Sequence, residues 1–220
     1  MVAHPVRTVL EVGTPGGPAR LHIDQPDDGR APHGVLVLGH GAGGGVGAPD
    51  LLAAVSAATG AGWRAIRFEQ PWRVAGRRVA VAPPRLDEAW LAGMDQVERA
   101  GPLVVGGRSA GARVACRTAV ATGAAAVLCL AFPLHPPGRP ERSRAPELAG
   151  AGRPVVVVQG IRDTFGTPAD LEALGLPGVE IIEAPSDHGL APRTKAGRDE
   201  LRAVVDLAVR RTLVLSASGA

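Results

Sequence analysis

The chain has 220 residues, and its 24 basic and 21 acidic side chains give a formal net charge of +3. This length suits one globular domain with a sizeable hydrophobic core. The basic residues are arginines apart from Lys195, and they are scattered among acidic residues, which excludes the basic blocks typical of a nucleic-acid-binding surface. No apolar run reaches the roughly 18 residues of a membrane span, and the first residues lack the pattern of a secretion signal.

The predicted elements alternate between strands and helices along most of the chain. The predicted strands are 7–12, 19–23, 35–38, 63–68, 103–106, 125–132, 155–158 and 179–182, and the predicted helices are 50–58, 86–99, 110–122, 168–174 and 195–213. The first two strands flank a Thr-Pro-Gly-Gly turn and predict a hairpin over about residues 6–23. The later strands are short continuous apolar runs, as is typical of strands buried on both faces.

This alternation predicts βαβ crossovers and therefore an α/β fold, with a mainly parallel sheet covered by helices on both faces. We expect a single domain over residues 1–220, in which residues 33–213 form the core behind the hairpin. Residues 69–84 read as an irregular loop rich in arginine and proline. The connection between Phe132 and Val155 is short and rich in the same two residues, so we expect no lid domain over the site.

The most informative motif is Gly107-Arg108-Ser109-Ala110-Gly111, which separates the strand 103–106 from the helix 110–122. Glycines on both sides of a serine permit a sharp strand-to-helix turn, known as a nucleophile elbow, that exposes the serine hydroxyl. The adjoining helix N-terminus stabilises negative charge that develops there. Five residues are a weak signal in a chain with 30 glycines, but their place between strand and helix favours a nucleophile over a plain turn.

Two further candidates follow apolar strands in the same way. Asp163 comes after the strand 155–158, and His188 comes after the strand 179–182. Ligand sites in such sheets lie at the carboxyl ends of the strands, so these side chains are expected near Ser109. A serine hydroxyl needs an imidazole to take its proton, and the imidazole needs a carboxylate to fix its tautomer. Asp187 is a rival acid, although neighbouring side chains tend to point apart.

The loop His40-Gly41-Ala42 follows the strand 35–38 and supplies the remaining chemistry. We expect the backbone N–H groups of Ala42 and Ala110 to form an oxyanion hole for the tetrahedral intermediate. His40 is a candidate either for contacting the substrate or for orienting this loop.

Three more side chains are candidate substrate contacts because of their place in the sequence. Arg108 and Arg162 stand beside two of the candidate catalytic residues, and Trp72 lies in the loop 69–84. The alternative is that both arginines are solvated and that the tryptophan only packs.

The cysteines and the absence of known binding motifs limit which cofactors and partners we expect. Cys116 and Cys129 lie in separate apolar segments, which predicts buried, reduced thiols and a cytoplasmic location. No cluster of histidine, cysteine and acidic residues has metal-ligand spacing, and no G-x-x-x-x-G-K-[ST] motif occurs. We expect no metal, no cofactor, and no nucleic-acid or membrane partner. The expected partner is a small-molecule acyl substrate, and the oligomeric state stays open.

Taken together, these motifs resemble the small, lid-free α/β-hydrolases, in particular the dienelactone-hydrolase-like group. They are most similar to predicted bacterial hydrolases related to the hydrolase-like domain of a chromatin acetyltransferase-complex subunit. The resemblance spans residues 35–213 and is carried by the motifs at 39–44, 107–111, 159–163 and 187–189.

The resemblance implies a Ser-Asp-His triad in that chain order, an acyl-enzyme intermediate and an esterase or thioesterase activity. Dienelactone hydrolases proper carry a cysteine where Ser109 stands, so their lactone substrate is not implied. Eukaryotic relatives that act as scaffolds keep a non-catalytic binding protein open as an alternative.

A dinucleotide-binding domain is the second alternative, because Gly39-x-Gly41-x-x-Gly44 lies between a strand and a helix and Glu69 ends the next strand. Two predicted strands precede this motif, however, and residues 41–50 read as a loop. This alternative also leaves the serine, aspartate and histidine unexplained. We therefore expect a hydrolase.

Overall fold

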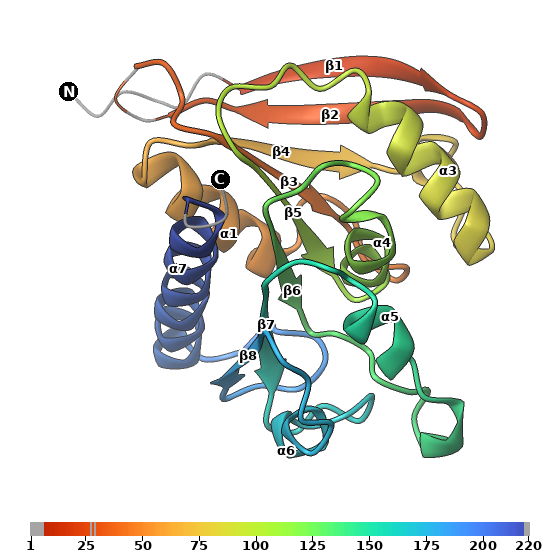
Figure 1. Cartoon of the computed structure of the whole chain (residues 1–220), viewed down its shortest axis with the longest axis vertical. Coiled ribbons are helices and arrows are strands. Elements are labelled where there is room, and N and C mark those ends of the chain that lie inside the picture. Colours follow the sequence, from red (N-terminus) through yellow and green to blue (C-terminus); the bar gives the residue numbers. More distant parts are fainter. Residues whose placement is uncertain (1–6, 27, 29, 218–220) are drawn as a thin grey trace.

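One eight-stranded sheet runs through the computed structural model, which describes residues 7–26, 28 and 30–217 (Figure 1). In space the strand order is β1-β2-β4-β3-β5-β6-β7-β8. The strands are β1 (Arg7–Thr14), β2 (Gly17–Asp24), β3 (Val35–Gly39), β4 (Arg64–Glu69), β5 (Leu103–Arg108), β6 (Ala126–Leu130), β7 (Val155–Gly160) and β8 (Val179–Ala184). The six strands β3 to β8 pair in parallel with one another. The strands β1 and β2 form an antiparallel hairpin, and β2 pairs antiparallel with β4.

The predicted hairpin and the mainly parallel sheet are therefore confirmed; residue 6, its predicted start, lies outside the described residues. The predicted strand 125–132 is too long at its end. β6 stops at Leu130 because Ala131 has a φ of 52°, which an extended strand does not allow.

Each strand from β3 onward is followed by at least one helix. They are α1 (Pro49–Gly60), α2 (Pro71–Val74), α3 (Pro83–Met94), α4 (Ala110–Thr118), α5 (Ala145–Ala149), α6 (Pro168–Glu172), α7 (Lys195–Ala217) and the 3₁₀ turn η1 (Pro140–Arg142). The prediction of an irregular loop over residues 69–84 was wrong in part, because this segment contains α2. Pro71 presets the backbone of the first turn of that helix. The predicted helix 86–99 ends earlier, at Met94, where the chain tightens into turns that lead to β5.

The two faces of the sheet carry different helices. The helices α1 and α7 cover one face, and α3, α4 and α5 cover the other (Figure 1). Successive residues of β3 alternate between the two layers: Leu36 and Leu38 pack with α1 and α7, whereas Val35 and Val37 pack with α3 and α4. Burial on both faces explains why the strands read as continuous apolar runs.

The connection from β6 to β7 contains only η1 and α5, so the chain has no lid domain there, as predicted. Cys116 and Cys129 are buried free thiols with their Sγ atoms 3.5 Å apart. Over the described ranges, none of the helices combines the length and the hydropathy that a membrane crossing needs.

Candidate active site

Ser109 lies at the sharp turn between β5 and α4, with a φ of 52° that is unusual for a residue other than glycine. The flanking glycines are required by packing. A Cβ atom on either Gly107 or Gly111 would collide with the backbone of Gly39 at the end of β3. The G-x-S-x-G pattern is therefore a consequence of how tightly the elbow sits on the neighbouring strand.

The structure brings together the three candidate catalytic side chains from three strand ends. The Oγ atom of Ser109 lies 2.9 Å from Nε2 of His188, and Nδ1 of His188 lies 2.7 Å from Oδ2 of Asp163. Because an ionised carboxylate only accepts hydrogen bonds, His188 donates from Nδ1, which leaves Nε2 free to accept the Ser109 proton.

The second carboxylate candidate lies elsewhere. Asp187 is exposed, and its Oδ1 accepts a hydrogen bond of 2.8 Å from the N–H of Gly189. Asp187 thus closes the turn that presents His188, whereas the buried Asp163 faces the imidazole.

Two residues that support this chain of hydrogen bonds were missed by the sequence analysis. The buried Gln159 donates from Nε2 to Oδ2 of Asp163 at 3.0 Å, and Phe165 donates its backbone N–H to Oδ1 at 2.8 Å. The ring of Phe165 also stacks on His188, with centroids 4.1 Å apart. Gln159 and Phe165 flank Asp163 in the sequence, but glutamine and phenylalanine carry no signal of such a role.

Arg108 connects the elbow to the loop that carries His188, here called the histidine loop. Its Nη2 donates to the carbonyl oxygens of His188 and Gly189, at 2.9 and 3.1 Å, and its Nε lies 3.1 Å from Oδ2 of Asp50. Asp50 is fully buried at the start of α1. Burial raises the pKa of Asp50 to about 6, although the Arg108 charge opposes that increase.

The two arginines predicted as substrate contacts therefore differ. The guanidinium of Arg108 is engaged by the protein itself, so its contacts are those of a residue that holds the histidine loop. Arg162 is exposed, and its backbone N–H donates to Ser186 O at 3.0 Å.

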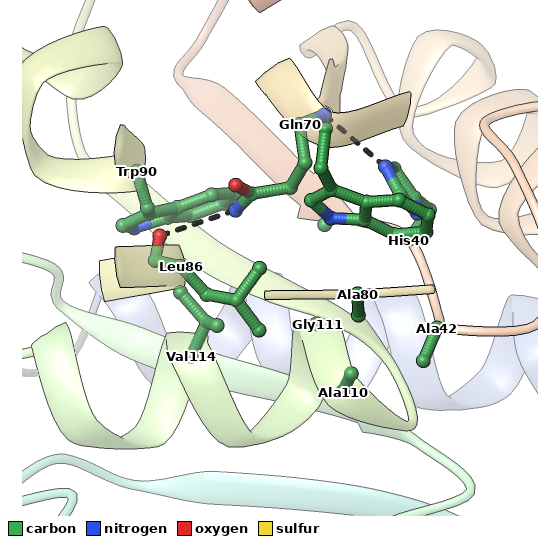
Figure 2. Close-up of a pocket in the computed structure, with 11 residues that line it drawn as sticks. His40, Ala42, Gln70, Ala80, Leu86, Trp90, Ala110, Gly111 and Val114 are labelled. Carbon is green, nitrogen blue, oxygen red and sulfur yellow. Dashed lines mark hydrogen bonds between the residues drawn. The ribbon is translucent and has the colours of Figure 1, made fainter. Parts of the chain in front are cut away.

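The expected oxyanion loop packs directly on the elbow. A Cβ atom on Gly41 would lie 2.9 Å from Nη1 of Arg108 and 3.5 Å from Cβ of Ser109, so a larger residue at this position would require the Arg108 guanidinium to shift. Ala110 is the first residue of α4, where a backbone N–H has no acceptor within the helix. Ala42 and Ala110 line the same pocket (Figure 2), as two donors to one oxyanion would.

His40 is buried, and both of its ring nitrogens are used by the backbone. Its Nε2 accepts the N–H of Gln70 at 3.1 Å (Figure 2), and its Nδ1 lies 2.9 Å from the carbonyl oxygen of Gly41. Since Nε2 accepts, Nδ1 carries the proton and donates it to Gly41. Burial lowers the pKa of His40 and so favours this neutral form. His40 thus orients the loop, which was the second of its two predicted roles.

Trp72 is buried and lines the pocket beside His40, with ring centroids 5.4 Å apart. Trp72 therefore forms part of the pocket wall and also packs in the core, so both of its predicted roles apply.

The dinucleotide alternative fits this geometry poorly. The helix α1 begins only at Pro49, several residues after Gly44, so no helix N-terminus opens at the third glycine. The carboxylate of Glu69 lies 3.0 Å from Nε2 of His22 instead of facing an empty site. Over the described ranges, no group of three or more histidine, cysteine or acidic side chains could hold a metal ion.

Residues 32–214 match a protein family described as an alpha/beta hydrolase domain. No curated protein sequence matches the chain. Three similar solved structures all share the fold. A serine hydrolase without a lid from Xanthomonas campestris has a TM-score of 0.71 at 21% identity, over 93% of this chain and 94% of that one. The esterase domain of a Rhodothermus marinus protein has a TM-score of 0.68 at 14% identity, over 94% and 97%. A thioesterase domain from the curacin biosynthetic pathway has a TM-score of 0.68 at 12% identity, over 93% and 99%.

Proposed function

The chain belongs to the α/β-hydrolase family, and we propose that it is a serine hydrolase that cleaves an ester, thioester or related acyl bond of a small substrate. The observation that carries this proposal is the continuous hydrogen-bonded chain from Asp163 through His188 to Ser109. This arrangement serves nucleophilic acyl transfer, and three strand ends far apart in the sequence supply it.

In the first half of the reaction, Ser109 Oγ attacks the acyl carbon while His188 Nε2 takes the hydroxyl proton. Asp163 stabilises the imidazolium that results. The N–H groups of Ala42 and Ala110 stabilise the oxyanion, and each such donor typically contributes about 3 kcal/mol to the transition state. The bond to the leaving group then breaks, and His188 gives its proton to the leaving oxygen or sulfur.

In the second half, water enters and His188 takes one of its protons as the water oxygen attacks the acyl-serine. The bond between Ser109 Oγ and the acyl carbon breaks, and the proton returns to Oγ. One acyl bond and one water are thereby converted into an acid and an alcohol or thiol, and the residues end in their starting states.

The names of the similar structures support both bond types. One neighbour is described as an esterase domain and another as a thioesterase domain. The connection between β6 and β7 carries only η1 and α5, which fits a substrate that needs no large enclosing cavity. The narrower resemblance to dienelactone-hydrolase-like proteins stays a prediction.

Labelling with a fluorophosphonate probe tests this proposal, because the probe reacts with an activated serine. We expect labelling of the native protein, loss of labelling in Ser109→Ala, and unchanged labelling in Ser143→Ala, which alters an exposed loop serine. A folded native protein that takes up no probe would contradict the catalytic proposal and favour the scaffold alternative.

A further inference from the structure

A small pocket lies directly beside the two expected oxyanion donors. Figure 2 shows Ala42 and Ala110 at one end of the group, and Leu86, Trp90 and Val114 at the other. The cavity volume is about 10 Å³, which is room for roughly one water-sized group. The surface that faces the cavity is almost entirely apolar. A methyl group therefore matches the pocket in both size and polarity.

The far wall of this pocket is fixed in place by hydrogen bonds and packing. The side chain of Gln70 donates to the carbonyl oxygen of Leu86 at 3.2 Å, while its backbone N–H donates to His40 at 3.1 Å (Figure 2). The Trp90 ring is fully buried and packs edge-on against Phe68, with centroids 5.3 Å apart. Because closely packed interiors resist insertion of extra methylene groups, this pocket does not widen easily.

The position of the pocket identifies the part of the substrate that enters it. When an acyl group is bonded to Ser109, its carbonyl oxygen points to the N–H groups of Ala42 and Ala110. The next carbon of the acyl chain is bonded to the same carbonyl carbon as that oxygen, so it lies close to Ala42 and Ala110, which line the pocket. His188, which gives its proton to the leaving group, does not line this pocket, so the leaving group lies outside it.

We infer that this is the acyl pocket and that it admits an acetyl group, so that the substrates are acetyl esters or thioesters with a larger leaving group. This inference rests on the proposed function. The acetyl carbon is transferred to Ser109 Oγ, the leaving atom takes the proton from His188, and water then releases acetate.

A series of p-nitrophenyl esters with the same leaving group tests the pocket size. We expect kcat/KM to fall by at least about tenfold from the acetate to the butyrate, and to fall again for the hexanoate, because each methylene that does not fit costs about that factor. Equal or faster hydrolysis of the butyrate or hexanoate by the native enzyme would overturn the acetyl assignment.

Enlarging the far end of the pocket gives the matched test. Leu86→Ala, and the smaller change Val114→Ala, should lower the ratio of acetate to butyrate kcat/KM by about tenfold. Leu148→Ala removes an equally buried leucine of α5 that does not line the pocket, and it should leave the ratio unchanged. A ratio that stays constant in folded Leu86→Ala and Val114→Ala proteins would refute the assignment.

Labelling with an ethyl fluorophosphonate separates the two levels of the argument. If the protein takes up the probe but does not discriminate between acyl chains, the acetyl assignment is refuted and the proposed serine hydrolase function stands. If the folded protein neither takes up the probe nor hydrolyses any ester, both the acetyl assignment and the proposed function are refuted.

Discussion

Replacing Arg108 by glutamine removes the guanidinium that joins the elbow to the histidine loop. That group donates to the carbonyl oxygens of His188 and Gly189 and pairs with the buried Asp50. Hydrogen bonds from a charged donor contribute about 1.5–3 kcal/mol each, so the two bonds together hold the loop with roughly 3–6 kcal/mol. Without them, His188 is free to move relative to Ser109.

We expect the Arg108→Gln change to lower kcat by about 100-fold, since a displacement of 1 Å at a catalytic group costs about that factor. KM should stay within about twofold, because in the structure this guanidinium binds the protein and is not needed to bind substrate. Steady-state hydrolysis of p-nitrophenyl acetate gives both constants, and circular dichroism shows whether the variant is folded.

Two further variants make this prediction decisive. Arg108→Lys keeps a positive charge near Asp50 but lacks the planar fork that reaches two carbonyl oxygens, so it should recover folding more fully than activity. Arg139→Gln is the matched control, because it changes an exposed arginine that has no assigned role in the site, and we expect no change in either constant. An increase in KM with an unchanged kcat in Arg108→Gln would refute the positioning role and restore Arg108 as a substrate contact.

Two other predictions follow from the carboxylates. Asp163→Asn should lower kcat by about 10⁴-fold because the histidine tautomer is no longer fixed, whereas Asp187→Asn should change it by less than about tenfold; equal losses in the two variants would contradict the assignment. Burial raises the pKa of Asp50 from 3.8 to about 6, so its contribution to stability is complete below pH 3.8 and is lost as the pH rises through 6. The free energy of unfolding in urea should therefore fall by about 2 kcal/mol more in the native protein than in Asp50→Asn between pH 4.5 and pH 7.5, and parallel pH profiles would show that Asp50 does not titrate in this way.

The parts of the site that the sequence predicts are those that depend on strand ends. Ser109, Asp163 and His188 each follow an apolar run, and parallel strands place their carboxyl ends at one edge of the sheet. This rule needs no knowledge of tertiary contacts. The same rule places the loop at Ala42 beside the elbow, which the structure also shows.

The parts that the sequence does not predict depend on contacts between distant segments. Arg108 binds carbonyl oxygens about 80 residues further along the chain, and no local pattern distinguishes it from the exposed Arg162. Gln159 acts through its side chain, and Phe165 acts through its backbone N–H and its ring, and a single sequence encodes neither role as a motif. The same limit applies to α2, a helix of four residues that is too short to show any hydrophobic period.

The central claim, that Ser109 forms an acyl-enzyme, is tested most directly by trapping that intermediate. Native protein is mixed rapidly with excess p-nitrophenyl acetate and quenched in acid. It is then digested with a protease, and the masses of its peptides are measured by mass spectrometry. Our account predicts one acetyl group on the peptide that carries Ser109, a burst of nitrophenolate equal to the number of chains, and neither signal in Ser109→Ala. An acetyl group on another residue, or a burst that persists in Ser109→Ala, would contradict the account.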